Sequence, residues 1–239
     1  MSRARTTRLL VSVRDEAEAL LAAGAGADFI DLKEPRAGAL GALPRERIAA
    51  VVRRLRESGS RLPISATVGD LPMADVEAIV ALVEATAGLG VDYVKVGIER
   101  EGGAAVLARL ARCDVPIVPV FIVDRGLDEA LVEQACGAFP GLMLDTADKR
   151  AGSLFARCPE PQLRGFVARV QAAGALAGLA GALRQADLPR LRALAPDFAG
   201  FRSAVCADDR TGALMPERVR GLAEALAPEA GRLRAVIGE

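Results

Sequence analysis

The chain has 239 residues, a formal net charge of zero, 51% hydrophobic residues and only 3% aromatic residues. Without excess positive charge or many aromatic side chains for stacking, we expect no binding to nucleic acid or to an anionic membrane. No apolar run is long enough to cross a bilayer, and the one near the N-terminus is too short for a signal peptide, so a cytoplasmic protein is expected.

Short apolar runs typical of β-strands recur along the chain, with stretches of helical periodicity between them. In chain order, the predicted strands are residues 9–13, 29–33, 64–68, 93–98, 117–123, 142–145, 176–179 and 198–205. Asp15 is expected to cap the first helix, which ends in glycine. Farther along, Pro189 is expected to start or interrupt a helix.

This alternation predicts an α/β fold with a parallel sheet, and eight strand–helix units in 239 residues favour a single-domain (β/α)8 TIM barrel. An open doubly wound sheet is the alternative. Its usual GxGxxG marker is missing after the first predicted strand, where the sequence reads RDEAEAL. No linker or change in composition divides the chain, so we expect one domain over residues 1–239.

Arginine outnumbers lysine 28 to 3, and the three lysines lie in or just after predicted strands. Lys33 ends FIDLK, Lys95 lies in YVKVGI, and Lys149 follows MLDTAD. A coding bias explains why lysine is scarce but not where it is placed. Lysine can lose its proton and form a Schiff base, whereas arginine stays protonated. Because alternate barrel strands share one interior layer, the three amines should converge at one mouth.

Two carboxylates accompany these lysines. Asp31 precedes Lys33 by two residues, so both should face the same side of the strand, and Asp145 precedes Lys149 by four. Each pair can move protons or form a structural salt bridge, and two pairs beside a third lysine favour catalysis. Burial and neighbouring ammonium groups should lower the pKa of at least one lysine, while the carboxylates oppose that shift.

The last two predicted strands lead into candidate phosphate-binding loops. Barrels often bind phosphate with the loops after strands seven and eight. Gly181 lies in the first of these loops, in GLAGALR, and Arg202 and Ser203 follow the start of the last predicted strand. These three residues are therefore the predicted phosphate site.

Four cysteines occur without CxxC spacing, and the chain has no histidine. We therefore expect no metal site and no cofactor. Cys206, at the end of the last predicted strand, should be a small buried hydrophobe because no histidine can activate it as a nucleophile.

The motifs around these residues resemble those of the (5-formylfuran-3-yl)methyl phosphate synthase family, also called 4-(hydroxymethyl)-2-furancarboxaldehyde-phosphate synthase. They are DLKEPRAGALGA at 31–42, KVGI at 95–98, LDTADKRAGSLF at 144–155, GLAGAL at 178–183, and FRSAVC with the later DRTG. The resemblance covers nearly the whole chain. It implies a TIM barrel, related to class I aldolases, that makes the furan precursor of methanofuran from two molecules of glyceraldehyde 3-phosphate without a metal.

The resemblance also implies roles for individual residues. Lys33 would form the Schiff base and Lys95 would accept a proton, with Asp31, Asp145 and Lys149 as supporting acid–base groups. The partner would be a small-molecule triose phosphate, and a homo-oligomer is expected.

Archaeal members carry a further lysine after the fifth strand, where this chain has Asp124 and Arg125. Arg125 could at most replace its charge. Two alternatives stay open: a generic class I aldolase-like enzyme of triose phosphates, and a non-catalytic phosphate-binding barrel.

Overall fold

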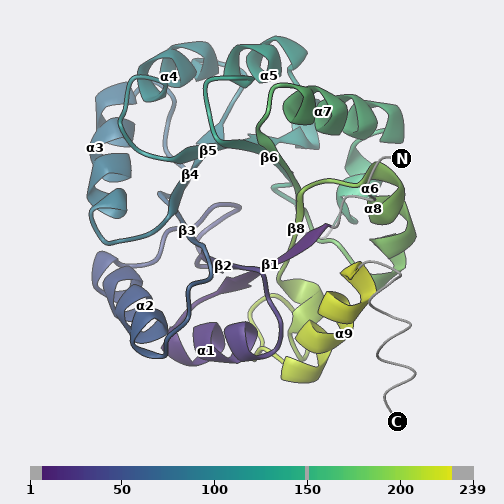
Figure 1. Ribbon diagram of the computed structural model, residues 1–239. Coiled ribbons are helices and arrows are strands. Elements are labelled where there is room, and N and C mark those ends of the chain that lie inside the picture. The colour runs from purple at the N-terminus through teal and green to yellow at the C-terminus, as the bar shows by residue number, and fades with distance from the viewer. Residues whose placement is uncertain (1–6, 149–150, 228–239) are drawn as a thin grey trace.

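A computed structural model describes residues 7–148 and 151–227, which form a closed barrel of parallel strands surrounded by helices (Figure 1). The strands pair in sequence order, and β8 closes on β1. They are β1 (Arg8–Val13), β2 (Phe29–Leu32), β3 (Ile64–Thr67), β4 (Tyr93–Ile98), β5 (Ile117–Ile122), β6 (Gly141–Asp145), β7 (Leu176–Leu179) and β8 (Phe198–Phe201). The predicted (β/α)8 barrel is therefore confirmed, and the open sheet is excluded.

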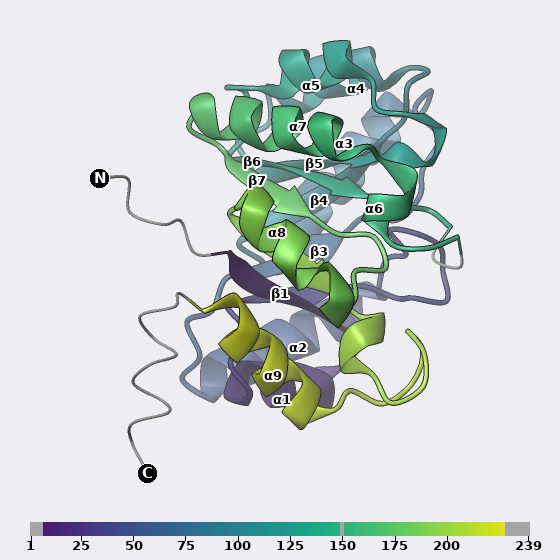
Figure 2. The same cartoon turned by 90° about the vertical axis from the view of Figure 1, so that its right-hand side faces the viewer.

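Helices connect successive strands and lie outside them, as the side view shows for α7, α8 and α9 (Figure 2). The α-helices are α1 (Glu16–Gly24), α2 (Arg45–Glu57), α3 (Val76–Ala87), α4 (Gly103–Leu110), α5 (Glu129–Ala135), α6 (Leu154–Arg157), α7 (Glu160–Ala172), α8 (Leu188–Leu194) and α9 (Pro216–Leu226). The 3-10 turns are η1 (Val123–Arg125), η2 (Gln185–Asp187) and η3 (Ser203–Val205). No helix among the described residues is long and apolar enough to cross a membrane.

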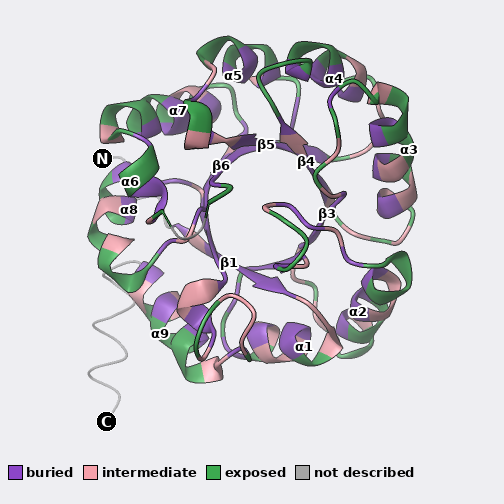
Figure 3. Ribbon diagram, turned by 180° about the vertical axis from the view of Figure 1, so that it is seen from behind, coloured by how far each residue is buried: buried purple, intermediate pink, exposed green. Residues whose placement is uncertain are grey.

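Alternation along β1 illustrates how the strands separate two apolar layers. Leu9, Val11 and Val13 belong to the large core between strands and helices, whereas Leu10 belongs to a smaller cluster inside the barrel and Ser12 lines its pocket. In Figure 3 the strands and the inner faces of the surrounding helices are buried, while the outer helix faces are exposed.

Acidic residues fix the N-terminal ends of three strand pairs. Asp28, Asp92 and Asp197 directly precede β2, β4 and β8. Their carboxylates accept the backbone amides of Leu9, Ile64 and Ala177 in neighbouring strands, at 2.7, 2.8 and 2.9 Å. These bonds satisfy amides at the strand starts and hold the register of each pair.

The inner cluster fills the barrel below the polar residues. Phe29 and Phe198 lie with their ring centroids 5.6 Å apart. Gly178 leaves room for the second ring, since a Cβ atom at this glycine would lie only 2.1 Å from Phe198 Cζ. Leu10 and Met143 of the same cluster line the pocket, so part of the pocket wall is apolar.

Several predicted boundaries differ from the structure, most clearly in the last strand. β8 ends at Phe201 and not at residue 205, because the backbone turns at Arg202 into the 3-10 turn η3. Cys206 thus lies beyond the strand and forms an isolated antiparallel bridge with Leu214, and it is buried as expected. Asp15 caps α1 by accepting the Glu18 amide, and Pro189 lies in the first turn of α8, as predicted.

Candidate active site

Two lysine–aspartate pairs lie together at the C-terminal mouth of the barrel. Lys95 Nζ on β4 lies 2.8 Å from Asp31 Oδ1 on β2, and Lys33 Nζ, just past β2, lies 3.3 Å from Asp145 Oδ2 on β6. All four residues are buried and line one pocket. The structure thus brings together four of the five predicted catalytic residues, while Lys149 lies outside the described residues.

The pairing of these charges differs from the sequence-based expectation. We expected Asp31 to accompany Lys33, but its salt bridge is with Lys95, and Lys33 reaches across the barrel to Asp145. Residues two apart on a strand are separated by about 6.6 Å, so their charged groups need not touch. Inward side chains from non-adjacent strands approach each other inside a closed barrel, which brings Lys95 on β4 to Asp31 on β2 and Lys33 to Asp145 on β6.

Asp31 accepts hydrogen bonds from three side chains of the pocket region. Besides Lys95, it accepts hydrogen bonds from Ser12 Oγ at 2.8 Å and Ser65 Oγ at 2.7 Å. Strand pairing places Ser12 and Ser65 directly beside Asp31 on either side. Burial by itself would raise the pKa of Asp31, but the charges of Lys95 and Lys33 and these hydrogen bonds hold it below its ordinary value.

The two lysines occupy different environments. Burial lowers the pKa of Lys95, and the charge of Lys33 adds to this effect, although Asp31 opposes it. The Lys95 side chain is 3% exposed, whereas that of Lys33 is 10% exposed. Lys95 is therefore the deeper amine with the lowered proton affinity, and Lys33 is the more accessible one.

The loop after β7 supports Asp145. Asp145 Oδ1 accepts the backbone amide of Thr146 at 2.7 Å. Gly181 packs against this residue, since a Cβ atom at Gly181 would lie 2.8 Å from Thr146 Cγ2, and its φ of +111° favours glycine. Gly181, predicted to bind phosphate, does line the pocket, and its carbonyl accepts the backbone amide of Leu154 at 2.8 Å.

Arg202 and Ser203 line the same pocket, but the guanidinium of Arg202 is fully occupied within the protein. Its nitrogens donate to both carboxylate oxygens of Glu18, at 2.5 and 3.1 Å, and to the carbonyls of Ser12, Arg210 and Gly212. These contacts use the five N–H donors that an arginine has. Phosphate binding by Arg202 and Ser203 stays a prediction, and the contacts of Arg202 favour a structural role.

A second arginine shares Glu18. Arg14 donates to Glu18 through its side chain and its backbone amide, and also donates to the Thr211 carbonyl at 2.8 Å. Burial acts to raise the pKa of Glu18, but the hydrogen bonds from Arg202 and Arg14 outweigh it and hold this pKa below its ordinary value. We refer to Arg14, Glu18 and Arg202 as the rim network.

Sequence reasoning did not single out Arg210, Ser12, Ser65 or Glu18. Arg210 belongs to the DRTG stretch and lines the pocket. The serines could have been found from alternation, because each occupies an inward position in an otherwise apolar strand. No local pattern links Glu18 to Arg202, which is 184 residues away.

Arg125, considered as a substitute for a missing lysine, is exposed and is not among the residues that line the pocket. Its neighbour Asp124 instead accepts the backbone amides of Ala147 and Asp148 and so fixes the start of the loop after β6. Among the described residues, no group of three or more histidine, cysteine or acidic side chains is placed to hold a metal ion.

Together, the fold and pocket define a TIM barrel with a buried lysine–carboxylate centre, an arrangement suited to amine nucleophiles and proton transfer. Residues 9–223 match the sequence model of the family described as 4-HFC-P synthase. The chain belongs to this family.

Relatives of similar length support the same assignment. The chain is 36% identical to (5-formylfuran-3-yl)methyl phosphate synthase of Methanopyrus kandleri over 245 residues, covering 92% of this chain and 99% of the relative. It is 32% identical to the Methanosarcina mazei protein of the same name, covering 90% and 97%. It is also 40% identical to a protein of Methylorubrum extorquens, covering 92% and 91%.

Among solved structures, phosphoribosyl anthranilate isomerase from Thermus thermophilus superposes with a TM-score of 0.65 at 19% identity, covering 92% of this chain and 98% of that chain. This similarity shows the barrel fold alone.

Proposed function

We propose that this protein is a (5-formylfuran-3-yl)methyl phosphate synthase that condenses two molecules of glyceraldehyde 3-phosphate through a Schiff base on Lys33. The observation that carries the proposal is the convergence of Lys33, Lys95, Asp31 and Asp145 in one pocket. Membership of the family, whose members in methanogens carry this name, supports the reaction. The product would serve the biosynthesis of methanofuran.

Lys33 is the better nucleophile of the two amines on geometric grounds. Its side chain is more accessible than that of Lys95, and its Nζ contacts one carboxylate oxygen at 3.3 Å. One of the two glyceraldehyde 3-phosphate molecules reacts as its ketone isomer. Asp145 can accept a proton as the Lys33 amine attacks the carbonyl carbon of this isomer. Loss of water from the adduct then gives the imine.

Lys95 is suited to move protons. Its lowered pKa and its contact with Asp31 make it a base that can remove a proton from the carbon next to the imine, giving an enamine. The enamine attacks the aldehyde of the second triose and forms the new carbon–carbon bond. Elimination of one phosphate and loss of two water molecules overall yields the furan, with no net oxidation or reduction.

The test is incubation of the purified protein with glyceraldehyde 3-phosphate, followed by ultraviolet spectroscopy and mass spectrometry. We expect a near-ultraviolet absorbance and the mass of the furan phosphate. An aldol product without this absorbance would indicate a generic class I aldolase. Absence both of turnover and of a borohydride-trapped adduct at Lys33 would indicate a non-catalytic phosphate-binding barrel.

A further inference from the structure

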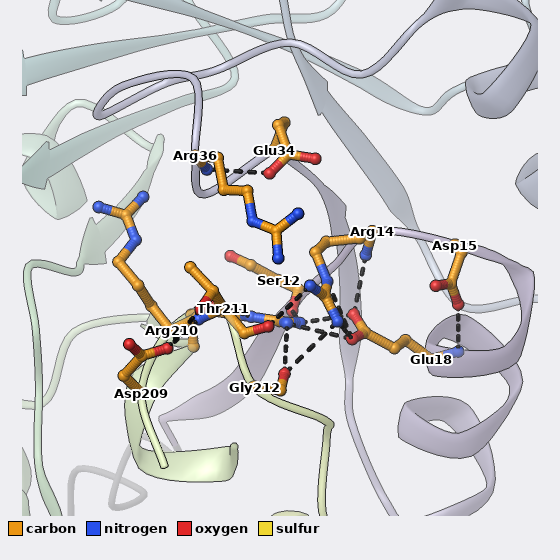
Figure 4. Close-up of polar contacts among 11 residues, drawn as sticks. Ser12, Arg14, Asp15, Glu18, Glu34, Arg36, Asp209, Arg210, Thr211 and Gly212 are labelled. Atoms are coloured by element: carbon orange, nitrogen blue, oxygen red, sulfur yellow. Dashed lines mark hydrogen bonds and ion pairs between the residues drawn. The ribbon is translucent and has the colours of Figure 1, made fainter. Parts of the chain in front are cut away.

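Arg210 brings a positive charge to the pocket that holds the two lysine–aspartate pairs. Its side chain is half-buried and lines the pocket, and its Nη2 donates to the neutral carbonyl of Gly38 at 3.1 Å. The adjacent Asp209 carboxylate is instead engaged by the amide and hydroxyl of Thr211, both at 2.7 Å. No described carboxylate forms a salt bridge with Arg210. In Figure 4 its guanidinium extends away from the rim network.

The other charged residues of the pocket are paired. Lys33 and Lys95 each have an aspartate partner, and Arg202 has Glu18. Arg210 is therefore the cation of the described pocket that forms no salt bridge, although the charges of Asp145, Asp209 and Glu34 act on it. Burial lowers the pKa of this arginine, and the carboxylates of Asp145, Asp209 and Glu34 only partly oppose the shift.

The backbone that carries Arg210 is held in place. Arg202 Nε donates to the Arg210 carbonyl at 2.8 Å, Arg14 donates to Thr211, and both arginines donate to Gly212. Three consecutive carbonyls are thus fixed by the rim network. Such anchoring reduces the conformational freedom that Arg210 would lose on binding a ligand.

We propose that Arg210 binds the phosphate group of a phosphate-ester substrate and thereby selects phosphorylated over unphosphorylated molecules, while Arg202 acts only by positioning the Arg210 loop. A guanidinium presents a planar fork of donors that matches phosphate oxygens. The pocket-lining Ser203 and Gly181 lie on the loops next to it. This inference deepens the proposed function, whose substrates are phosphate esters.

The test measures binding without catalysis, by isothermal titration calorimetry with glycerol 3-phosphate, which has no carbonyl and cannot react with a lysine. We expect wild type to bind this probe, and Arg210→Gln to weaken binding by about tenfold or more, as for a lost charge-assisted contact. Arg210→Lys, which keeps the charge but not the fork, should weaken binding by less. Arg53→Gln, an exposed position on α2, is the matched control and should bind within about twofold of wild type. Glycerol should not bind.

Two results would overturn the inference: no binding of glycerol 3-phosphate to wild type, or equal binding to wild type and Arg210→Gln. Thermal melting of each variant checks that the fold is retained, and Arg210→Lys supplies the comparison if Arg210→Gln does not fold. Failure of the proposed function is separate. Arg210-dependent binding without furan formation would leave this inference standing, whereas furan formation with binding independent of Arg210 would refute it alone.

Discussion

The lysine–aspartate centre and the rim network are both clusters of buried charges at the same end of the barrel, yet they differ in how fully their cations are bonded. Arg202 uses its donors on Glu18 and on three backbone carbonyls, so the network can do little except hold the structure. Lys33 and Lys95 each contact one carboxylate and face a pocket. A cation with spare capacity beside a void is available for chemistry, and a saturated cation is not.

The substitution with the largest expected effect on this comparison is Lys33→Arg. We expect turnover to fall by at least about 10³-fold, because arginine keeps the charge but cannot form an imine at neutral pH. The fold should survive, as circular dichroism and thermal melting would show. Furan formation within about tenfold of wild type would refute the Schiff-base assignment to this residue.

A second test separates the two lysines. Lys95→Ala should lower furan formation by about 10²-fold or more while borohydride still traps substrate at Lys33, because a lost base slows proton transfer and leaves the nucleophile. Asp31→Asn should act similarly, since the amide keeps the shape and loses the charge. Trapped fraction and furan yield are measured on the same samples. Loss of trapping in Lys95→Ala with retention in Lys33→Ala would reverse the two roles.

The rim network is tested by stability. Glu18→Gln leaves the buried Arg202 and the partly buried Arg14 without their counter-charge. We expect it to lower the free energy of unfolding by about 3 kcal/mol, measured by urea denaturation. Glu77→Gln is the matched control, because its salt bridge with Arg109 is exposed and should contribute less than about 1 kcal/mol. Equal effects of the two substitutions would contradict the structural role of the network.

The loss of Glu18 should also change how stability depends on pH. The folded pKa of Glu18 lies below its ordinary value of 4.5, so its contribution to stability is present above that pH and is lost as the pH falls through the folded pKa. Stability of Glu18→Gln should therefore fall less steeply than that of wild type below about pH 4.5. A parallel decline of both proteins over this acid range would argue against the ionised Glu18.

The smallest expected effect is that of a chelator. Furan formation should be unchanged in EDTA, because the proposed steps use amines and carboxylates that are already in place. Activity that is lost in EDTA and restored by a divalent ion would show that the lysine centre needs a metal partner.

The barrel was predictable from the sequence because apolar strand-like runs and stretches of helical periodicity are local patterns. Alternation placed Asp31 and Lys33 on one face and assigned both to a strand end at the mouth. The partners of these charges were not predictable, since Lys33 meets Asp145 and Glu18 meets Arg202 only after the barrel has closed. The end of β8 was placed too late, because Ala204 and Val205 continue an apolar run while the backbone has already turned at Arg202.

The packing of Phe29 against Phe198 inside the barrel has a consequence for the direction and order of substrate binding. Because these rings lie at the N-terminal ends of β2 and β8, we expect both substrates to enter from the C-terminal mouth of the barrel. In the proposed reaction, the triose that becomes attached to Lys33 must arrive first, and the second triose must follow behind it. Ordered binding of the two substrates would then follow from the shape of the barrel, without a moving loop.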